Sequence, residues 1–196
     1  MSTWISALRE NLLGRGLLAS ARARRFAAAA TLMLATTVSA WIVIPVPGSP
    51  VPLTLQTFVV LAGAALLGGR VSASAQATYL LLGGVGLPLF TSALGGPMMF
   101  GATGGYLIGF VLASWLIGAL LRNQSATGLR LIGALVLGNL VILGCGSIWL
   151  ASFLHVSWAK ALAMGALPFL LGDTVKLATA AALVRVAGTR TRRFVV

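Results

Sequence analysis

Long apolar runs alternate with short segments that hold almost every charge, and this pattern constrains the fold more than any motif. We place the apolar runs at 26–44, 54–67, 71–85, 103–121, 131–150 and 161–186. The mean hydropathy of the 196 residues is +1.01, and only 8% of them are charged. Because about 20 apolar residues in a helix cross the hydrocarbon core of a bilayer, the sequence predicts an all-α, polytopic membrane protein with six transmembrane helices.

The basic residues predict how the six helices are oriented. With the N-terminus in the cytoplasm, six crossings place these basic residues on the cytoplasmic side: Arg22, Arg24, Arg25, Arg70, Arg122, Arg130 and the arginines after Val184. The outer loops then carry only Lys160. This is the positive-inside distribution in every loop, so we expect both termini to be cytoplasmic.

The chain divides into three parts on charge and hydropathy. Residues 1–25 form a basic, amphipathic segment that we expect on the membrane surface, 26–187 form the membrane domain, and 188–196 form a basic tail. The net charge of +12 could indicate nucleic acid as a partner. Because the arginines lie outside the apolar runs and set the topology, we expect the lipid bilayer and no nucleic acid as a partner.

Two opposite charges interrupt the last apolar run. Asp173 is the only acidic residue after Glu10, and Lys176 follows three residues later, which places both on one face of a helix. A charge at the centre of a transmembrane helix costs about 2.5–3.5 kcal/mol on insertion scales. The pair either neutralises itself and tolerates burial, or it forms a binding site, which is the default interpretation of ionisable residues inside a membrane.

Three loops lie on the same outer side as this ion pair in the six-helix topology. They are the proline-rich segment 45–52, the uncharged glycine- and proline-rich segment 83–101 with Phe90, and the aromatic turn 149–158. We expect the second of these to fold over a cavity as a lid. The matching ligand is a small amphiphile with an acid group for Lys176 and N–H donors for Asp173.

Several other polar or small residues are candidates for the same cavity or for helix packing. Gln56 either caps the second helix or lines the pocket. Asn139 needs a partner in hydrocarbon, either another helix or the ligand. The glycines after Thr103 allow close approach of a helix or of a ligand. Small residues also share one helix face, formed by Ala23, Ala27, Thr31 and Ala35. This face packs either inside the chain or against a second subunit, so a homo-oligomer is one possible arrangement.

Five motifs stand out along the chain. They are Pro-Val-Pro-Leu-Thr-Leu-Gln-Thr-Phe at 50–58, Tyr-Leu-Leu-Leu-Gly at 79–83, Gly-Leu-Pro-Leu-Phe at 86–90, Thr-Gly-Gly-Tyr-Leu-Ile-Gly-Phe at 103–110, and Leu-Pro-Phe at 167–169 with Gly172, Asp173 and Lys176. Together they resemble the BioY family, the biotin-specific substrate-binding (S) components of energy-coupling factor (ECF) transporters. The resemblance runs from about Ala27 to Ala182. Gly69, Ala102 and Leu171 depart from it where proline is expected.

The resemblance implies a six-helix S-component fold in a bacterial inner membrane that captures biotin from outside. By this likeness Lys176 holds the valerate carboxylate and Asp173 the ureido N–H groups. Further contacts are implied for Asn139, Tyr106, Gln56, Phe90, and the backbone of Thr103, Gly104 and Gly105. The resemblance also implies a transmembrane coupling (T) protein and paired ATPases. The face of Ala23, Ala27, Thr31 and Ala35 is the candidate surface for the T protein.

Other functions have less support in the residues. A proton-coupled transporter that works alone, with Asp173 as proton carrier, remains the alternative. An enzyme is not expected, because His155 and Asp173 are the only histidine and the only membrane acid. No cofactor or metal is expected either, since Cys145 is the sole cysteine. A purely structural scaffold leaves the two ions unexplained.

Overall fold

The computed structural model describes residues 20–90, 101–122 and 128–195, with side chains up to Ala187. Its long helices are α2 (Ala21–Ala40), α3 (Gln56–Leu67), α4 (Gly69–Gly84), α5 (Gly104–Leu120), α6 (Gly128–Leu154) and α8 (Leu170–Val195). The shorter elements are α7 (Trp158–Gly165), the 3₁₀ turn η3 (Leu167–Phe169), and strands β1 (Val43–Ile44) and β2 (Leu53–Thr54). The predicted all-α fold with six principal helices is confirmed.

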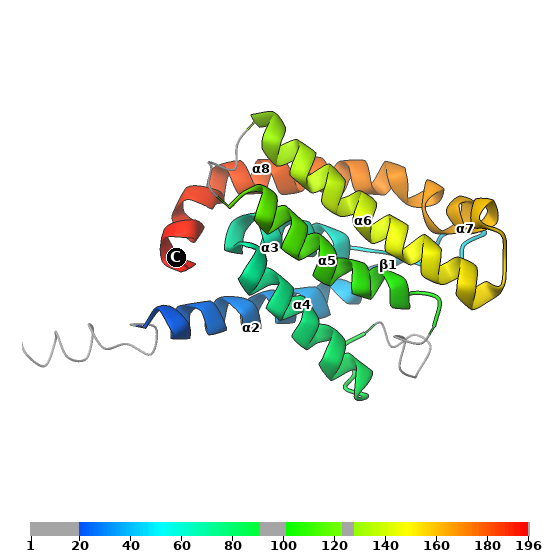
Figure 1. Ribbon diagram of the computed structural model, residues 1–196, viewed down its shortest axis with the longest axis horizontal. Helices are drawn as coiled ribbons and strands as arrows, with labels where there is room; N and C mark the ends of the chain where they lie inside the picture. Colours follow the sequence, from blue (N-terminus) through cyan, green and yellow to red (C-terminus); the bar gives the residue numbers. More distant parts are fainter. Residues whose placement is uncertain (1–19, 91–100, 123–127, 196) are drawn as a thin grey trace, which may run out of the picture.

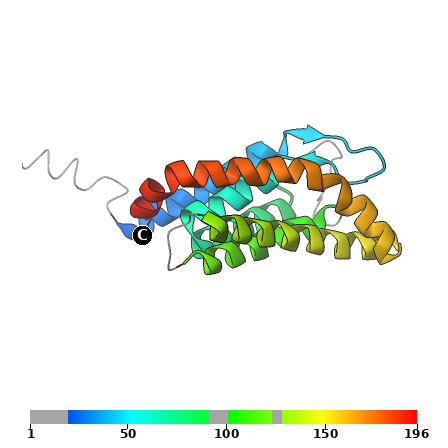
Figure 2. The same cartoon turned by 90° about the horizontal axis from the view of Figure 1, so that it is seen from above.

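The six principal helices run up and down through one bundle (Figures 1 and 2). The described N-terminal end, the α3–α4 turn and the C-terminus lie at one end, while the β1–β2 hairpin and α7 lie at the other. Helix α5 packs against α4 and α6, and α3 packs against α8, α5 and α2. The core between them is built from the buried apolar faces of α3, α5 and α6.

Glycine makes the tight turn between α3 and α4. Gly68 has a φ of +84°, a backbone conformation that other residues rarely adopt, and it ends α3 as α4 begins. The backbone of Gly69 then lies directly against Gly118 of α5, where a Cβ on Gly118 would overlap Gly69. The Gly68-Gly69 pair therefore sets both the reversal of the chain and the contact between α4 and α5.

Not every principal helix is long enough to cross a bilayer. Within the described residues, only Gly128–Leu154 and the helical stretch Trp158–Ala187 meet the length and hydropathy of a membrane span, and Gln56–Leu67 and Gly104–Leu120 are apolar but shorter. The 12 residues of α3 rise only about 18 Å. The non-helical backbone before α3 lines a protein cavity, and such backbone is tolerated in membrane proteins where it lines a cavity rather than lipid.

The prediction of the first span needs correction at its C-terminal end. We predicted a helix to Ile44, but α2 ends at Ala40 and the chain becomes extended. Val43 pairs with Thr54 and Ile44 with Leu53 in an antiparallel two-stranded ribbon. The prolines between the two strands exclude helix there, and the hairpin satisfies backbone groups that the prolines leave without helical partners.

The last span is not one helix, contrary to the prediction of a continuous run from Ala161. It consists of α7, a break at Ala166, the turn η3 with Pro168, and α8 from Leu170. Proline lacks the N–H that a continuous helix needs and restricts the residue before it. The break therefore gives α8 an N-terminus of its own inside the protein.

The remaining predicted boundaries differ by a few residues or lie outside the described residues. Helix α2 starts at Ala21 and α8 continues to Val195. The segment boundaries that we predicted after residues 25 and 187 therefore fall inside continuous helices. Helix α6 is longer than predicted at both ends. Most of the expected surface segment 1–25 and most of the expected lid 83–101 lie outside the described residues.

Candidate ligand-binding site

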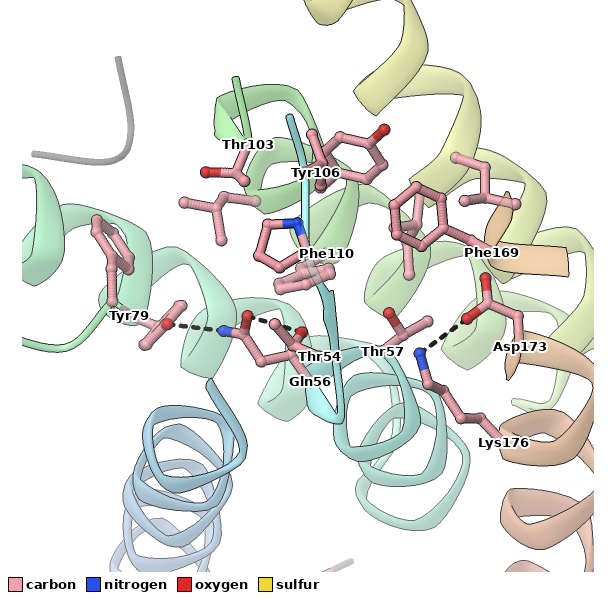
Figure 3. Close-up of a pocket in the computed structure, with 16 residues that line it drawn as sticks. Thr54, Gln56, Thr57, Tyr79, Thr103, Tyr106, Phe110, Phe169, Asp173 and Lys176 are labelled. Atoms are coloured by element: carbon pink, nitrogen blue, oxygen red, sulfur yellow. Dashed lines mark hydrogen bonds and ion pairs between the residues drawn. The ribbon is translucent and has the colours of Figure 1, made fainter. Parts of the chain in front are cut away.

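A cavity lies among α3, α4, α5, α6, α8 and the segment before α3 (Figure 3). It holds about 630 Å³ of space that no atom fills, part of it open to solvent. The lining residues are Val51, Pro52, Thr54, Gln56, Thr57, Tyr79, Phe90, Thr103, Tyr106, Leu107, Phe110, Ile142, Leu143, Phe169, Asp173 and Lys176. A mostly apolar lining with a few polar groups is typical of a small-molecule site.

Asp173 and Lys176 form a buried ion pair in the cavity wall, as predicted from their spacing. Lys176 Nζ donates to Asp173 Oδ1 at 2.9 Å, and the two side chains are 8% and 4% exposed, respectively. Asp173 lies in the first turn of α8. The positive end of the helix dipole therefore also stabilises its carboxylate, and this position follows from the break at Pro168.

Asn139 holds the other oxygen of the same carboxylate. Its Nδ2 donates to Asp173 Oδ2 at 3.1 Å, and the side chain is buried on α6. Asn139 is not among the cavity-lining residues, and its Oδ1 has no hydrogen-bond partner within the described part of the chain. Of the two roles we considered, the structure supports contact between helices, which fixes the orientation of Asp173.

A second polar cluster faces the ion pair across the cavity (Figure 3). Gln56 Nε2 donates to Tyr79 Oη at 2.8 Å, and Thr54 Oγ1 donates to Gln56 Oε1 at 3.2 Å. Tyr79 Oη in turn donates to the carbonyl of Leu89 at 3.1 Å. Gln56 thus lines the pocket and makes no helix-capping bond, which settles the alternative that the sequence left open.

Aromatic rings form much of the wall between the two polar ends. The rings of Phe90 and Tyr79 meet edge to face with centroids 5.1 Å apart, and those of Tyr106 and Phe169 are 6.3 Å apart. Tyr106 Oη donates to the carbonyl of Gly165 at 2.6 Å. The predicted site residues Phe90 and Tyr106 therefore line the cavity, and Tyr106 presents its ring while its hydroxyl bonds the break before α8.

The Thr103-Gly104-Gly105 segment is only partly in the predicted place. Thr103 lines the cavity, whereas Gly104 and Gly105 are buried outside its lining. A Cβ on Gly105 would overlap the carbonyl oxygen of Cys145 and the side chain of Trp149 on α6. The glycine at this position thus serves close helix packing, and the expectation that its backbone contacts the ligand is not supported.

Several lining residues escaped the sequence argument. Thr57, Phe110 and Phe169 stand inside the motifs that carry the family resemblance, but we gave them no role. Tyr79 was also missed, although a phenol in a buried apolar helix needs a hydrogen-bond partner and could have been flagged on that ground. The apolar residues Leu107, Ile142 and Leu143 have no distinguishing signal in the sequence, because they look like any other core residue.

The geometry suits binding rather than catalysis. The cavity offers one anion and one cation at one end, neutral hydrogen-bonding groups at the other, and aromatic walls between them. Within the described residues, no group of three His, Cys, Asp or Glu side chains could hold a metal ion. A ligand with separate charged and hydrogen-bonding groups can satisfy both ions without leaving a buried charge unpaired.

The sequence profile of the BioY family matches residues 11–193 of the chain. A biotin transporter BioY of Thermotoga maritima is 38% identical over 144 residues, which cover 74% of this chain and 83% of that protein. A probable biotin transporter BioY of Pyrococcus horikoshii is 37% identical over 159 residues, covering 81% and 93%. Biotin transporter BioY2 of Lactococcus lactis is 34% identical over 134 residues, covering 67% and 72%.

One solved structure has the same architecture. It is a crystal structure of the S-component for biotin from an ECF-type ABC transporter, with a TM-score of 0.75 and 26% sequence identity. The similarity covers 84% of this chain and 90% of that one. This chain thus shares its fold with a transporter S-component of known structure.

Proposed function

This chain belongs to the BioY family, and we propose that it takes up biotin as the membrane-embedded substrate-binding subunit of an ECF-type transporter. The observation that carries the proposal at the level of residues is the buried Asp173–Lys176 pair in the cavity wall. A membrane protein rarely retains two such ions in a helix unless they serve a ligand or each other. The chain is a transport subunit and not an enzyme.

Biotin can give each ion of the pair a new partner in place of the other ion. Its carboxylate would accept hydrogen bonds from Lys176, and its ureido N–H groups would donate to Asp173. Because the two side chains touch in the structure, an extended ligand requires Lys176 to swing away from Asp173, which its flexible four-carbon stem allows. Asn139 keeps Asp173 in place during this exchange.

The rest of the cavity would hold the apolar part of the ligand. Phe90, Tyr106 and Phe169 offer aromatic surface, and Gln56 offers an amide at the far end from the ion pair. Thr103 is a further polar residue of the cavity lining. We assign no ligand contact to the two glycines that follow it.

The orientation in the membrane follows from the charges. The arginines of the N-terminal end, the α3–α4 turn and α8 lie at the end of the bundle opposite the hairpin and α7. The positive-inside rule makes that end cytoplasmic. The chain is then a multi-pass protein of the inner membrane with both termini in the cytoplasm, and the cavity opens toward the outer side, where biotin enters.

Transport itself needs partners. Neither lysine of the chain follows a glycine, so the sequence contains no Walker A loop to bind ATP. A transmembrane coupling protein and paired ATPases supply the energy in this proposal. The face of Ala23, Ala27, Thr31 and Ala35 is the docking surface for the coupling protein, since small residues allow a second helix to approach closely. Thr31 is exposed there.

Equilibrium binding of radiolabelled biotin to the purified protein tests the proposal. We expect wild type and Lys160→Met to bind biotin and Lys176→Met to lose most of the affinity, because Lys160 is an exposed lysine outside the cavity. A panel of other small vitamins should not compete. Equal binding by the Lys176 and Lys160 variants would rule out this site.

Biotin uptake by cells distinguishes an ECF-type subunit from a solitary proton-coupled transporter. In a host that lacks the coupling protein and its ATPases, this chain alone should not accumulate biotin, and co-expression of those partners should restore uptake. Accumulation by the chain alone, abolished by an uncoupler, would instead make Asp173 the proton carrier of a solitary transporter.

A further inference from the structure

A second hollow lies between α2 and α4, away from the ligand cavity. It encloses about 910 Å³ of space that no atom fills, including its open side. Its lining residues are Arg25, Phe26, Ala29, Ala30, Met33, Arg70, Val71, Ser74, Ala75 and Thr78. On each helix they follow the same spacing, i, i+1, i+4, i+5 and i+8, which describes one continuous face. The hollow is therefore a groove between one face of α2 and one face of α4, each about 12 Å long at 1.5 Å per residue.

The groove is charged at one end and apolar along the rest. Arg25 and Arg70 open the two series of lining residues, and both lie at the end of the bundle that holds the termini. Arg70 is exposed and makes no hydrogen bond or ion pair in the part of the chain that the structure describes. Both arginines thus line the same end of one groove.

The polar side chains farther along the groove are already satisfied. Ser74 Oγ donates to the carbonyl of Val71 at 2.8 Å, and Thr78 Oγ1 donates to the carbonyl of Ser74 at 2.9 Å. These hydroxyls bond their own helix and leave the wall beyond the arginines with no polar group in need of a partner. That wall suits a hydrocarbon chain rather than a polar peptide.

The groove is separate from both surfaces discussed above. Tyr79, which lines the ligand cavity, lies on a different face of α4 from Thr78. On α2, at 100° per residue, the groove residues are centred about 150° from the face of Ala23, Ala27, Thr31 and Ala35. An occupant of the groove therefore blocks neither biotin nor the proposed docking surface.

We propose that this groove binds an anionic glycerophospholipid. The phosphate lies between Arg25 and Arg70, because guanidinium groups bind phosphate through paired, charge-assisted hydrogen bonds. One acyl chain runs along the apolar wall between α2 and α4. Basic pockets between transmembrane helices on the cytoplasmic side are typical sites for such headgroups.

Charge complementarity favours a lipid over a second copy of the chain. The whole sequence has two acidic residues. Asp173 is buried in its ion pair, and Glu10 lies outside the described residues. The described part of a second copy therefore has no exposed acidic side chain to place against this end of the groove, whereas a phosphodiester carries the matching negative charge.

Native mass spectrometry of the purified protein titrated with phosphatidylglycerol or phosphatidylcholine tests the proposal. The test variant is Arg25→Gln/Arg70→Gln. The matched control is Arg122→Gln/Arg185→Gln, which removes the same charge from two exposed arginines that do not line the groove. Biotin binding by each variant reports whether the fold is intact.

We expect phosphatidylglycerol to bind wild type and the control alike and to bind the test variant about 30-fold more weakly, at roughly fivefold per arginine. Phosphatidylcholine should bind all three weakly. Three results would overturn the proposal: equal binding of the two lipids by wild type, equal losses in both variants, or a dimer in wild type that becomes monomeric in the test variant with lipid binding unchanged. If the test variant still binds biotin, its loss of lipid binding cannot be due to a damaged biotin site.

Discussion

Removing both ions of the buried pair should destabilise the protein far less than removing either ion alone. Lys176 Nζ and Asp173 Oδ1 are 2.9 Å apart, and both side chains are buried. At an effective dielectric constant of about 20, unit charges at that separation attract by roughly 6 kcal/mol, much of which desolvation offsets. A single substitution loses the attraction but leaves one buried ion unpaired, which typically costs about 3–5 kcal/mol.

The two single variants should not be equal. In Lys176→Met, Asp173 keeps the hydrogen bond from Asn139 and its place in the first turn of α8. In Asp173→Leu, Lys176 loses its only hydrogen-bond partner within the described residues. We therefore expect the lysine variant near the lower end of that range and the aspartate variant near the upper end. The double variant should lie close to wild type, since neither ion remains to be buried.

Thermal unfolding in detergent, followed with a thiol-reactive fluorophore, measures these differences. Cys145 is the sole cysteine and lies half-buried on α6, so it reacts fully only when the bundle opens. For a chain of this size, about 2–4 °C accompanies each kcal/mol, which predicts a drop in Tm of roughly 6–20 °C for the single variants.

The double variant also separates stability from function, because it should fold and yet bind no biotin. The reasoning is refuted if the double variant loses as much stability as the two single variants added together. It is refuted equally if each single variant costs less than about 1 kcal/mol, the value expected for an exposed pair.

Three further substitutions probe packing, the second polar cluster and the partner surface. Gly105→Ala should lower the free energy of unfolding by about 1–3 kcal/mol, measured by thermal unfolding, because the added methyl group forces α5 away from α6. The control is Gly133→Ala, whose methyl group meets nothing within 4 Å, and it should be neutral or stabilising. Tyr79→Phe should leave the buried amide of Gln56 without its acceptor, costing about 1–3 kcal/mol and weakening biotin binding; unchanged values for both would contradict the network. Thr31→Trp should abolish co-purification with the coupling protein while equilibrium biotin binding stays normal, and retained co-purification would place the docking surface elsewhere.

The helix count and the ion pair could be predicted from the sequence because both depend on local patterns. Apolar runs of suitable length predict helices in a membrane, and a spacing of three places Asp173 and Lys176 on one helix face. The family resemblance then added the ligand. Pocket lining by Gln56, Tyr106 and Phe90 followed from motifs rather than from hydropathy.

The features that the sequence did not predict depend on contacts between distant segments. The β1–β2 hairpin needs the pairing of Val43 with Thr54 across the proline segment, which hydropathy does not reveal. The sequence allowed Gly105 to contact either a ligand or another helix, and only the position of α6 shows that it packs against a helix. The break before α8 is different, because Pro168 marks a helix N-terminus in the sequence while the apolar run 161–186 continues on both sides of it.

The contact between Lys176 and the ligand carboxylate is tested most directly by removing the charge of the ligand, the charge of the lysine, or both. Biotin and biotin methyl ester, which lacks the charge, are compared for equilibrium binding to wild type and to Lys176→Met. We expect wild type to prefer biotin by about 10- to 150-fold, the range of one charged hydrogen bond, and the variant to bind both equally weakly. A variant that still prefers biotin as strongly as wild type would contradict the account, because the carboxylate would then have another partner.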